Sequence, residues 1–150
     1  MEHATSSSER IERSERISLS RLWWVGPLVV AMSVVANAVF REIAVVLFAV
    51  SPAFHNLRWI HFITFTVVAV SAAVVVFAVV ARYSHRPIHL YRQIAVVVLV
   101  LSFIPNIAMF FGNAPGQTPA AILTLMSMHV VDAAICIGLL PSLTSINKYQ

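Results

Sequence analysis

A histidine and an aspartate stand close together in the last long apolar stretch of the chain, "MHVVDAAICIG", residues 128–138. His129 and Asp132 are three residues apart, so on a helix they lie on one face and can touch. A carboxylate beside an imidazole can fix the imidazole tautomer and favour its charged form. We therefore expect the pair to titrate as a coupled unit. Such a pair can take up and release a proton, which raises the question of why it stands among apolar residues.

Polar residues recur at helical spacing in two other apolar stretches, where Asn37 and Asn106 are the central ones. Ser33 and Arg41 accompany Asn37, Ser102 accompanies Asn106, and Thr124 precedes Asp132 by two turns. At about 1.5 Å per residue, Asn37 and Asn106 lie about 21 Å from the basic ends of their stretches. His129 lies about 18 Å, and Asp132 about 13 Å, from the corresponding end of the last stretch. Polar groups of three helices would thus meet in one layer and face the interior of a bundle.

Two roles remain open for this layer. Amides such as those of Asn37 and Asn106 commonly join membrane helices by hydrogen bonds, each contributing about 0.6–2 kcal/mol. For His129 and Asp132, a structural role would mean a neutral histidine bonded to a neighbour and an aspartate neutralised by an arginine or a proton. A functional role is also open, since ionisable residues within membrane spans often mark proton or ion paths.

Arg41 and Glu42 form a second pair of charged residues, late in the first apolar stretch. Adjacent side chains on a helix point about 100° apart, so we expect these two not to face each other and to need separate partners. Arg58 and His61, on the outer side, are candidate partners for Glu42. An Arg41–Asp132 pair is the alternative for the arginine, although estimated depths that differ by about 14 Å would require a register shift or intervening water.

The composition identifies the solvent around these residues. The chain has 150 residues, 59% of them hydrophobic and 11% charged, and its mean hydropathy is +0.86. Soluble domains average about 45–50% apolar and about 25% charged residues. Apolar runs that reach the ~20 residues of a membrane-spanning helix, and that are too long for strands, cover 23–50, 59–81, 93–111 and 119–140. The sequence therefore predicts an all-α membrane protein with four transmembrane helices.

Short connections between the runs predict antiparallel neighbours in an up-down-up-down bundle. Basic residues concentrate before the first helix, in the second connection and in the tail, which predicts that both termini lie in the cytoplasm. The first run is too long for the apolar part of a signal peptide, so we expect it to remain in the mature protein. We divide the chain into a polar segment, a transmembrane domain and a tail, at 1–21, 22–143 and 144–150.

Other site chemistries find little support in the sequence. Zinc needs three or four ligands, and no second histidine lies at the depth of His129 and Asp132, since His61 is near the outer face. Haem held between two histidines fails for the same reason. Cys136 is the only cysteine, so no internal disulfide can form. With no phosphate-binding loop, no nucleophile elbow and scattered basic residues, we expect no enzymatic activity, no cofactor or metal, and no nucleic-acid partner.

Three stretches give the chain a resemblance to a known family: "RLWWVGPLVVAMSVVANAVFREIAV", "ARYSHRPIHLYR" and "TPAAILTLMSMHVVDAAICIGLL". Through them the chain resembles a family of small four-helix membrane proteins found mainly in actinobacteria and classed as a domain of unknown function. The resemblance covers about residues 21–143. It implies a compact, single-domain protein of the bacterial inner membrane, and it implies no activity, cofactor or site residue.

The favoured functional hypothesis is a non-enzymatic membrane protein whose polar interior serves helix packing and, in addition, the passage of protons or small solutes. Four helices leave little room for a solvated path, so passage would imply a homo-oligomer. An accessory or assembly subunit of a larger membrane complex is one alternative. A redox protein that binds a cofactor through His129 is another. The lipid bilayer is the partner that the composition itself predicts.

Overall fold

The computed structural model describes residues 17–51, 54–112 and 114–146, which four long α-helices dominate. These helices are α2 (Leu22–Phe48), α3 (Trp59–Tyr83), α4 (Pro87–Met109) and α5 (Pro119–Thr144). A short 3-10 turn precedes two of them, η1 (Leu19–Arg21) before α2 and η2 (His55–Leu57) before α3. The all-α prediction is confirmed. Most of the predicted cytoplasmic segment, 1–16, and the end of the predicted tail, 147–150, lie outside the described residues.

All four helices are long and apolar enough to cross a membrane, as predicted. Their ends differ from those of the apolar runs. α2 stops at Phe48, because Ala49 adopts a left-handed conformation with φ of 48°. α4 begins as early as Pro87, in the first turn, where a missing N–H costs no helical hydrogen bond. α5 continues to Thr144. Hydropathy detects only the apolar part of a helix, so the predicted run omits the polar first turns of α4.

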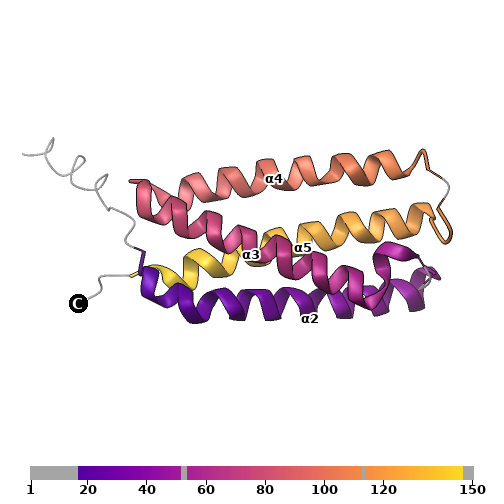
Figure 1. Ribbon diagram of the computed structural model, residues 1–150, viewed down its shortest axis with the longest axis horizontal. Coiled ribbons are helices and arrows are strands. Elements are labelled where there is room, and N and C mark those ends of the chain that lie inside the picture. The colour runs from indigo at the N-terminus through magenta and orange to yellow at the C-terminus, as the bar shows by residue number, and fades with distance from the viewer. Residues whose placement is uncertain (1–16, 52–53, 113, 147–150) are drawn as a thin grey trace, which may run out of the picture.

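The connections alternate between the two ends of the bundle, so consecutive helices run in opposite directions (Figure 1). We call the end that holds both described chain ends and the α3–α4 connection the proximal end, and the other the distal end. At the proximal end, Ile17 pairs with Ser145 in a β-bridge, and Ser18 N donates to Thr144 O at 2.9 Å. These contacts tie the start of α2 to the end of α5.

Helix α5 is the central element, since it packs against α2, α3 and α4. Its interface with α2 is the most extensive in the bundle. α2 and α4 lie on opposite sides of α3 and α5 (Figure 1). Because α3 and α5 separate α2 from α4, side chains of all four helices can meet only next to α3 and α5.

Buried apolar side chains form two clusters, one in each half of the bundle. The proximal cluster contains Val25, Val29, Val70, Phe77, Val80, Tyr91, Cys136 and Leu140. The distal cluster contains Ala44, Val50, Phe54, Leu57, Ala121, Leu125 and Met128. Between them lie the buried polar residues Ser33, Asn37 and Thr66. The candidate site is this polar layer near the middle of the helices.

Helix α4 buries only Pro87, Tyr91 and Asn106 within the bundle. Most of its Val, Leu and Ile side chains point outward, and α3 presents a similar surface. Soluble monomers rarely expose apolar patches of more than a few hundred Å². This outer surface is instead suited to lipid.

Leu140 tests the packing of the proximal cluster. It is fully buried, at 0% exposure, whereas Leu123 on the same helix is 55% exposed. Because lipid replaces water around separated helices, Leu140→Ala loses packing contacts but little transfer free energy, and we expect it to cost about 1–3 kcal/mol rather than the 2–5 of soluble cores. Leu123→Ala should cost under about 0.5 kcal/mol. Denaturation of the purified protein in detergent measures both, and equal losses would contradict the burial pattern.

Candidate functional site

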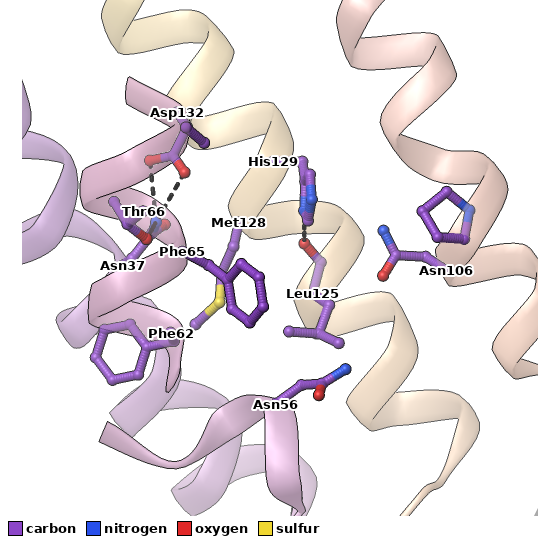
Figure 2. A pocket seen from close by; sticks show the side chains of 12 residues that line it. Asn37, Asn56, Phe62, Phe65, Thr66, Asn106, Leu125, Met128, His129 and Asp132 are labelled. Carbon is purple, nitrogen blue, oxygen red and sulfur yellow. Dashed lines mark hydrogen bonds between the residues drawn. The ribbon is translucent and has the colours of Figure 1, made fainter. Parts of the chain in front are cut away.

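One amide joins three helices at the centre of the polar layer (Figure 2). Asn37 Nδ2 on α2 donates to both carboxylate oxygens of Asp132 on α5, Oδ1 at 2.9 Å and Oδ2 at 3.0 Å. The same nitrogen donates to Thr66 Oγ1 on α3 at 3.1 Å. Asn37 is 1% exposed, so these hydrogen bonds are shielded from lipid and water.

Residues spaced four apart explain why these side chains meet, because they share one face of a helix. Ser33, Asn37 and Arg41 form such a row on α2, and all three are buried, which is the face that the sequence predicted. Phe62 and Thr66 belong to the buried face of α3. The two faces meet α5 at the level of the aspartate.

His129 finds its partner within α5 (Figure 2). Its Nδ1 lies 2.6 Å from the carbonyl oxygen of Leu125, one turn earlier. A carbonyl oxygen only accepts, so Nδ1 carries the hydrogen, and Nε2 of the neutral ring is left as an acceptor. Among the described residues no hydrogen bond or ion pair joins His129 to Asp132, although the two interact electrostatically. The predicted pair therefore shares a helix face, while each member has a partner of its own.

A cavity of about 260 Å³ opens on the distal side of this layer. We call it the distal cavity, and its polar lining consists of Asn37, Asn56, Thr66, Asn106, His129 and Asp132. Its apolar lining includes Phe62, Phe65, Leu125 and Met128. Of the six residues predicted to form an intramembrane cluster, Asn37, Asn106, His129 and Asp132 line it, whereas Arg41 and Glu42 do not.

A second cavity, of about 150 Å³, lies toward the proximal end, and we call it the proximal cavity. Small side chains of three helices form much of its wall, namely Ala69, Ala73, Ala95 and Ala133. Tyr91 and Cys136 line it at the level of the proximal cluster. His129 and Asp132 line both cavities, so the pair stands where one cavity follows the other along the bundle.

Several buried polar atoms near the cavities have no hydrogen-bond partner among the residues that the structure describes. Asn37 Oδ1 is one of them, and Ser33 Oγ, which lies near the Asp132 carboxylate, is another. Tyr91 Oη, beside the Cys136 thiol, is another. Leaving such an atom unpaired costs about 1–3 kcal/mol. The site therefore gains free energy from any ligand or water that pairs with these atoms.

Asn106 differs from Asn37 in how it uses its amide. Its Nδ2 donates to Ser102 O at 2.9 Å, within α4 itself, rather than to another helix. The role predicted for both asparagines, a hydrogen bond between helices, is therefore seen for Asn37 only. The carbonyl oxygen of the Asn106 side chain remains available at the distal cavity.

The prediction that Arg41 and Glu42 would need separate partners is wrong. Arg41 Nη1 forms an ion pair with Glu42 Oε1, while Arg41 Nε donates to Leu57 O at 2.7 Å and the guanidinium lies 4.9 Å from the centre of the Trp59 ring. Adjacent side chains leave a helix about 100° apart, but the long arginine side chain can bend around the helix to reach its neighbour. Its side chain is 6% exposed and that of Glu42 is 52% exposed, so the pair lies at the rim of the distal end. The alternative Arg41–Asp132 pair does not form.

Arg58 and His61, the predicted partners of Glu42, form no ion pair with it in the described part of the chain. The His61 ring stacks on His55, with ring centres 3.9 Å apart. Within 17–51, 54–112 and 114–146, no group of three His, Cys, Asp or Glu side chains could hold a metal ion. The histidine pair at the distal end is therefore short of the three or four ligands that zinc needs.

The sequence reasoning missed Thr66, Asn56 and Tyr91. Thr66 is one of three hydroxyl residues in the Val-rich second run, with Thr64 and Ser71, and its place four residues after the buried Phe62 was the available signal. Asn56 belongs to a connection, and its place beside the cavity depends on how η2 folds back over the helix ends. Tyr91 lies just before the third predicted run, in the part of α4 that hydropathy does not mark.

Four antiparallel helices with an apolar outer surface and a polar layer inside are the architecture of a multi-pass membrane protein. The chain belongs to a family of unknown function (DUF6069), whose model matches residues 17–145. The match spans all four long helices and confirms the resemblance to a family of unknown function. Comparisons with curated proteins and with solved structures gave no match.

The hydrogen bonds between Asn37 and Asp132 should couple these residues energetically. Interhelical hydrogen bonds in membranes contribute about 0.6–2 kcal/mol, so a double-mutant cycle of Asn37→Ala and Asp132→Ala should give a coupling free energy of about 1–2 kcal/mol. Thr124 is the control, because its hydroxyl donates to Ala120 O on the same helix. Asn37→Ala and Thr124→Val should be additive within about 0.5 kcal/mol. Additivity for the asparagine–aspartate cycle as well would show that the bonds do not hold the helices together.

Proposed function

We propose that this protein is a non-enzymatic protein of the cytoplasmic membrane that passes protons between its two cavities through His129 and Asp132. The observation that carries the proposal is that both side chains line both cavities. Ionisable residues inside membrane spans are costly, and they commonly face cavities that serve proton or ion paths. No Lys or Arg side chain within the described ranges forms an ion pair with the aspartate, so its charge is free to respond to a proton.

His129 is set up to accept a proton without losing its hydrogen bond. Nδ1–H already donates to Leu125 O, so an arriving proton binds at Nε2 and produces an imidazolium. The Asp132 carboxylate, one turn further along α5, stabilises that charge and is itself a proton acceptor. Asn37 holds both of its oxygens in place. A proton that enters from one cavity can thus reside on either group before it leaves toward the other.

The proximal cluster separates the proximal cavity from the proximal end of the bundle. Phe77 packs edge-on against Tyr91, with ring centres 4.8 Å apart, and Leu140 is fully buried in the same cluster. Complete passage therefore requires this cluster to open or a second copy of the chain to complete the path. We propose a homo-oligomer as the working form, because one copy of the chain leaves the path incomplete.

The orientation that we propose places the proximal end in the cytoplasm. Arg82, Arg86 and Arg92 are exposed there, and Arg21 ends the turn before α2. The distal end holds Arg58, while its other arginine is neutralised by Glu42. An excess of basic residues on the cytoplasmic side is the usual pattern of multi-pass proteins.

Two exposed positions at opposite ends test this orientation. On a Cys136→Ser background, Ala114→Cys lies at the distal end and His85→Cys at the proximal end. A membrane-impermeant thiol reagent should label the first in intact cells and the second only after the membrane is permeabilised. The inverse labelling pattern would overturn the proposed orientation.

Proteoliposomes that contain a pH-sensitive dye test the proposed passage. The wild-type protein should dissipate an imposed pH gradient faster than protein-free liposomes do. Asp132→Asn and His129→Ala should return the rate to that background, because each removes a proton acceptor shared by the two cavities. Thr124→Val, buried on the same helix but outside both cavity linings, should keep the wild-type rate.

Wild-type liposomes without flux at any pH, together with a destabilised Asp132→Asn variant, would assign the pair a structural role. Copurification of a fixed heterologous partner would then favour the accessory-subunit alternative. A visible absorbance band that His129→Ala abolishes would favour the redox alternative.

A further inference from the structure

We infer that the distal cavity binds a monovalent organic ammonium ion, a protonated amine with an apolar body of about ten non-hydrogen atoms. The inference names a ligand for the site of the proposed proton passage and in that sense rests on it. Binding is nevertheless measurable without any transport. Three properties of the cavity lead to this class of ligand: the atoms that it leaves unpaired, its charge, and its size and apolar lining.

Three polar side chains that line the cavity, those of Asn37, Asn106 and His129, donate within the protein and present an acceptor. Asn37 Nδ2 is occupied by Asp132 and Thr66, which leaves the buried Asn37 Oδ1 without a partner. Asn106 Nδ2 gives one hydrogen to Ser102 O of its own helix, and its Oδ1 remains as an acceptor beside the second hydrogen. His129 Nδ1 is occupied by a backbone carbonyl, which leaves Nε2. An ammonium group, which offers only donors, can pair with these three acceptors.

The charge of the cavity also favours a cation. Asp132 supplies one formal negative charge, and no Lys or Arg ion-pairs with it in the described part of the chain. Arg41, the buried arginine of the distal half, is already engaged by Glu42 and Leu57 O. A carboxylate buried in a membrane protein without a cation is costly. One positive charge on a ligand balances it, which is why we specify a monovalent ion.

Size and apolar lining select an organic ammonium ion over an inorganic one. A dry cavity of about 150 Å³ holds benzene, so 260 Å³ accommodates a molecule of about ten non-hydrogen atoms. Phe62, Phe65 and Met128 line the cavity beside its polar groups (Figure 2). Aromatic faces attract both apolar groups and cations. An inorganic ion would leave most of this space to water, and the apolar lining offers that water no hydrogen bonds.

Three probes of one shape separate charge from size: 2-phenylethylammonium, 2-phenylethanol and phenylacetate. We expect saturable calorimetric binding of the ammonium ion to the full-length protein in detergent, corrected with protein-free micelles. The alcohol should bind at least about tenfold more weakly, because a charge-assisted hydrogen bond contributes about 1.5–3 kcal/mol. Phenylacetate should not bind. Equal affinity for the ammonium ion and the alcohol would overturn the inference.

Variants locate the bound ion. Asp132→Asn should abolish the preference for the ammonium ion over the alcohol, whereas Thr124→Val should keep it. Asn106→Leu, which leaves the Asn37–Asp132 bonds intact, should weaken ammonium binding even if Asp132→Asn fails to fold. Unchanged ammonium binding by a folded Asp132→Asn protein, or by Asn106→Leu, would place the ligand elsewhere and overturn the inference.

The two proposals fail separately. Ammonium binding that follows these variants, without proton flux in liposomes, would refute the proposed passage and leave the ligand assignment intact. Proton flux that depends on Asp132, without a preference for the ammonium ion, would refute the ligand assignment alone.

Discussion

Lipid offers no hydrogen-bond donor to a buried carboxylate, and the arrangement of this bundle depends on how Asp132 is satisfied from within. Asn37 donates to both of its oxygens from α2, and α2 and α5 share the most extensive interface. The same amide donates to Thr66, which brings α3 to the same level. Apolar contacts between helices gain little over contacts with lipid. A single amide therefore sets the depth and rotation of three helices, and the two apolar clusters pack around it.

Helix α4 stands outside this network, and the cavities follow from that. Asn106 and Ser102 both donate to carbonyls of α4 itself, so neither side-chain donor ties α4 to another long helix. Yet α4 provides a wall of each cavity, with Asn106 at the distal one and Tyr91 at the proximal one. Displacement of α4 would therefore change access to both cavities.

The sequence predicted the helices and their polar faces but not which polar groups pair. Helix length and hydropathy are local properties, and residues four apart share a face wherever the helix lies, so the row Ser33–Asn37–Arg41 was predictable. Pairing depends on relative depth, which sequence fixes only to about a turn, so Asn37 was not assigned to Asp132. Arg41 was misassigned because its long side chain spans the angle that separates it from Glu42 on the helix, and because its partner Leu57 O comes from a connection. Such contacts exist only once the chain is folded.

The acceptor character of the site follows from a local property of helices in a membrane. A side-chain donor on a helix can bond to a carbonyl one turn earlier, as His129 does to Leu125 O and Asn106 to Ser102 O. Each such bond uses the donor and leaves the acceptor of the same side chain facing the space between helices. Here the helices also place the carboxylate of Asp132 in the wall of that space. The space thereby becomes selective for a proton or a cation without any residue dedicated to recognition. An anion would instead be repelled by the Asp132 carboxylate, whose oxygens accept from Asn37 while His129 Nδ1–H is held by Leu125 O.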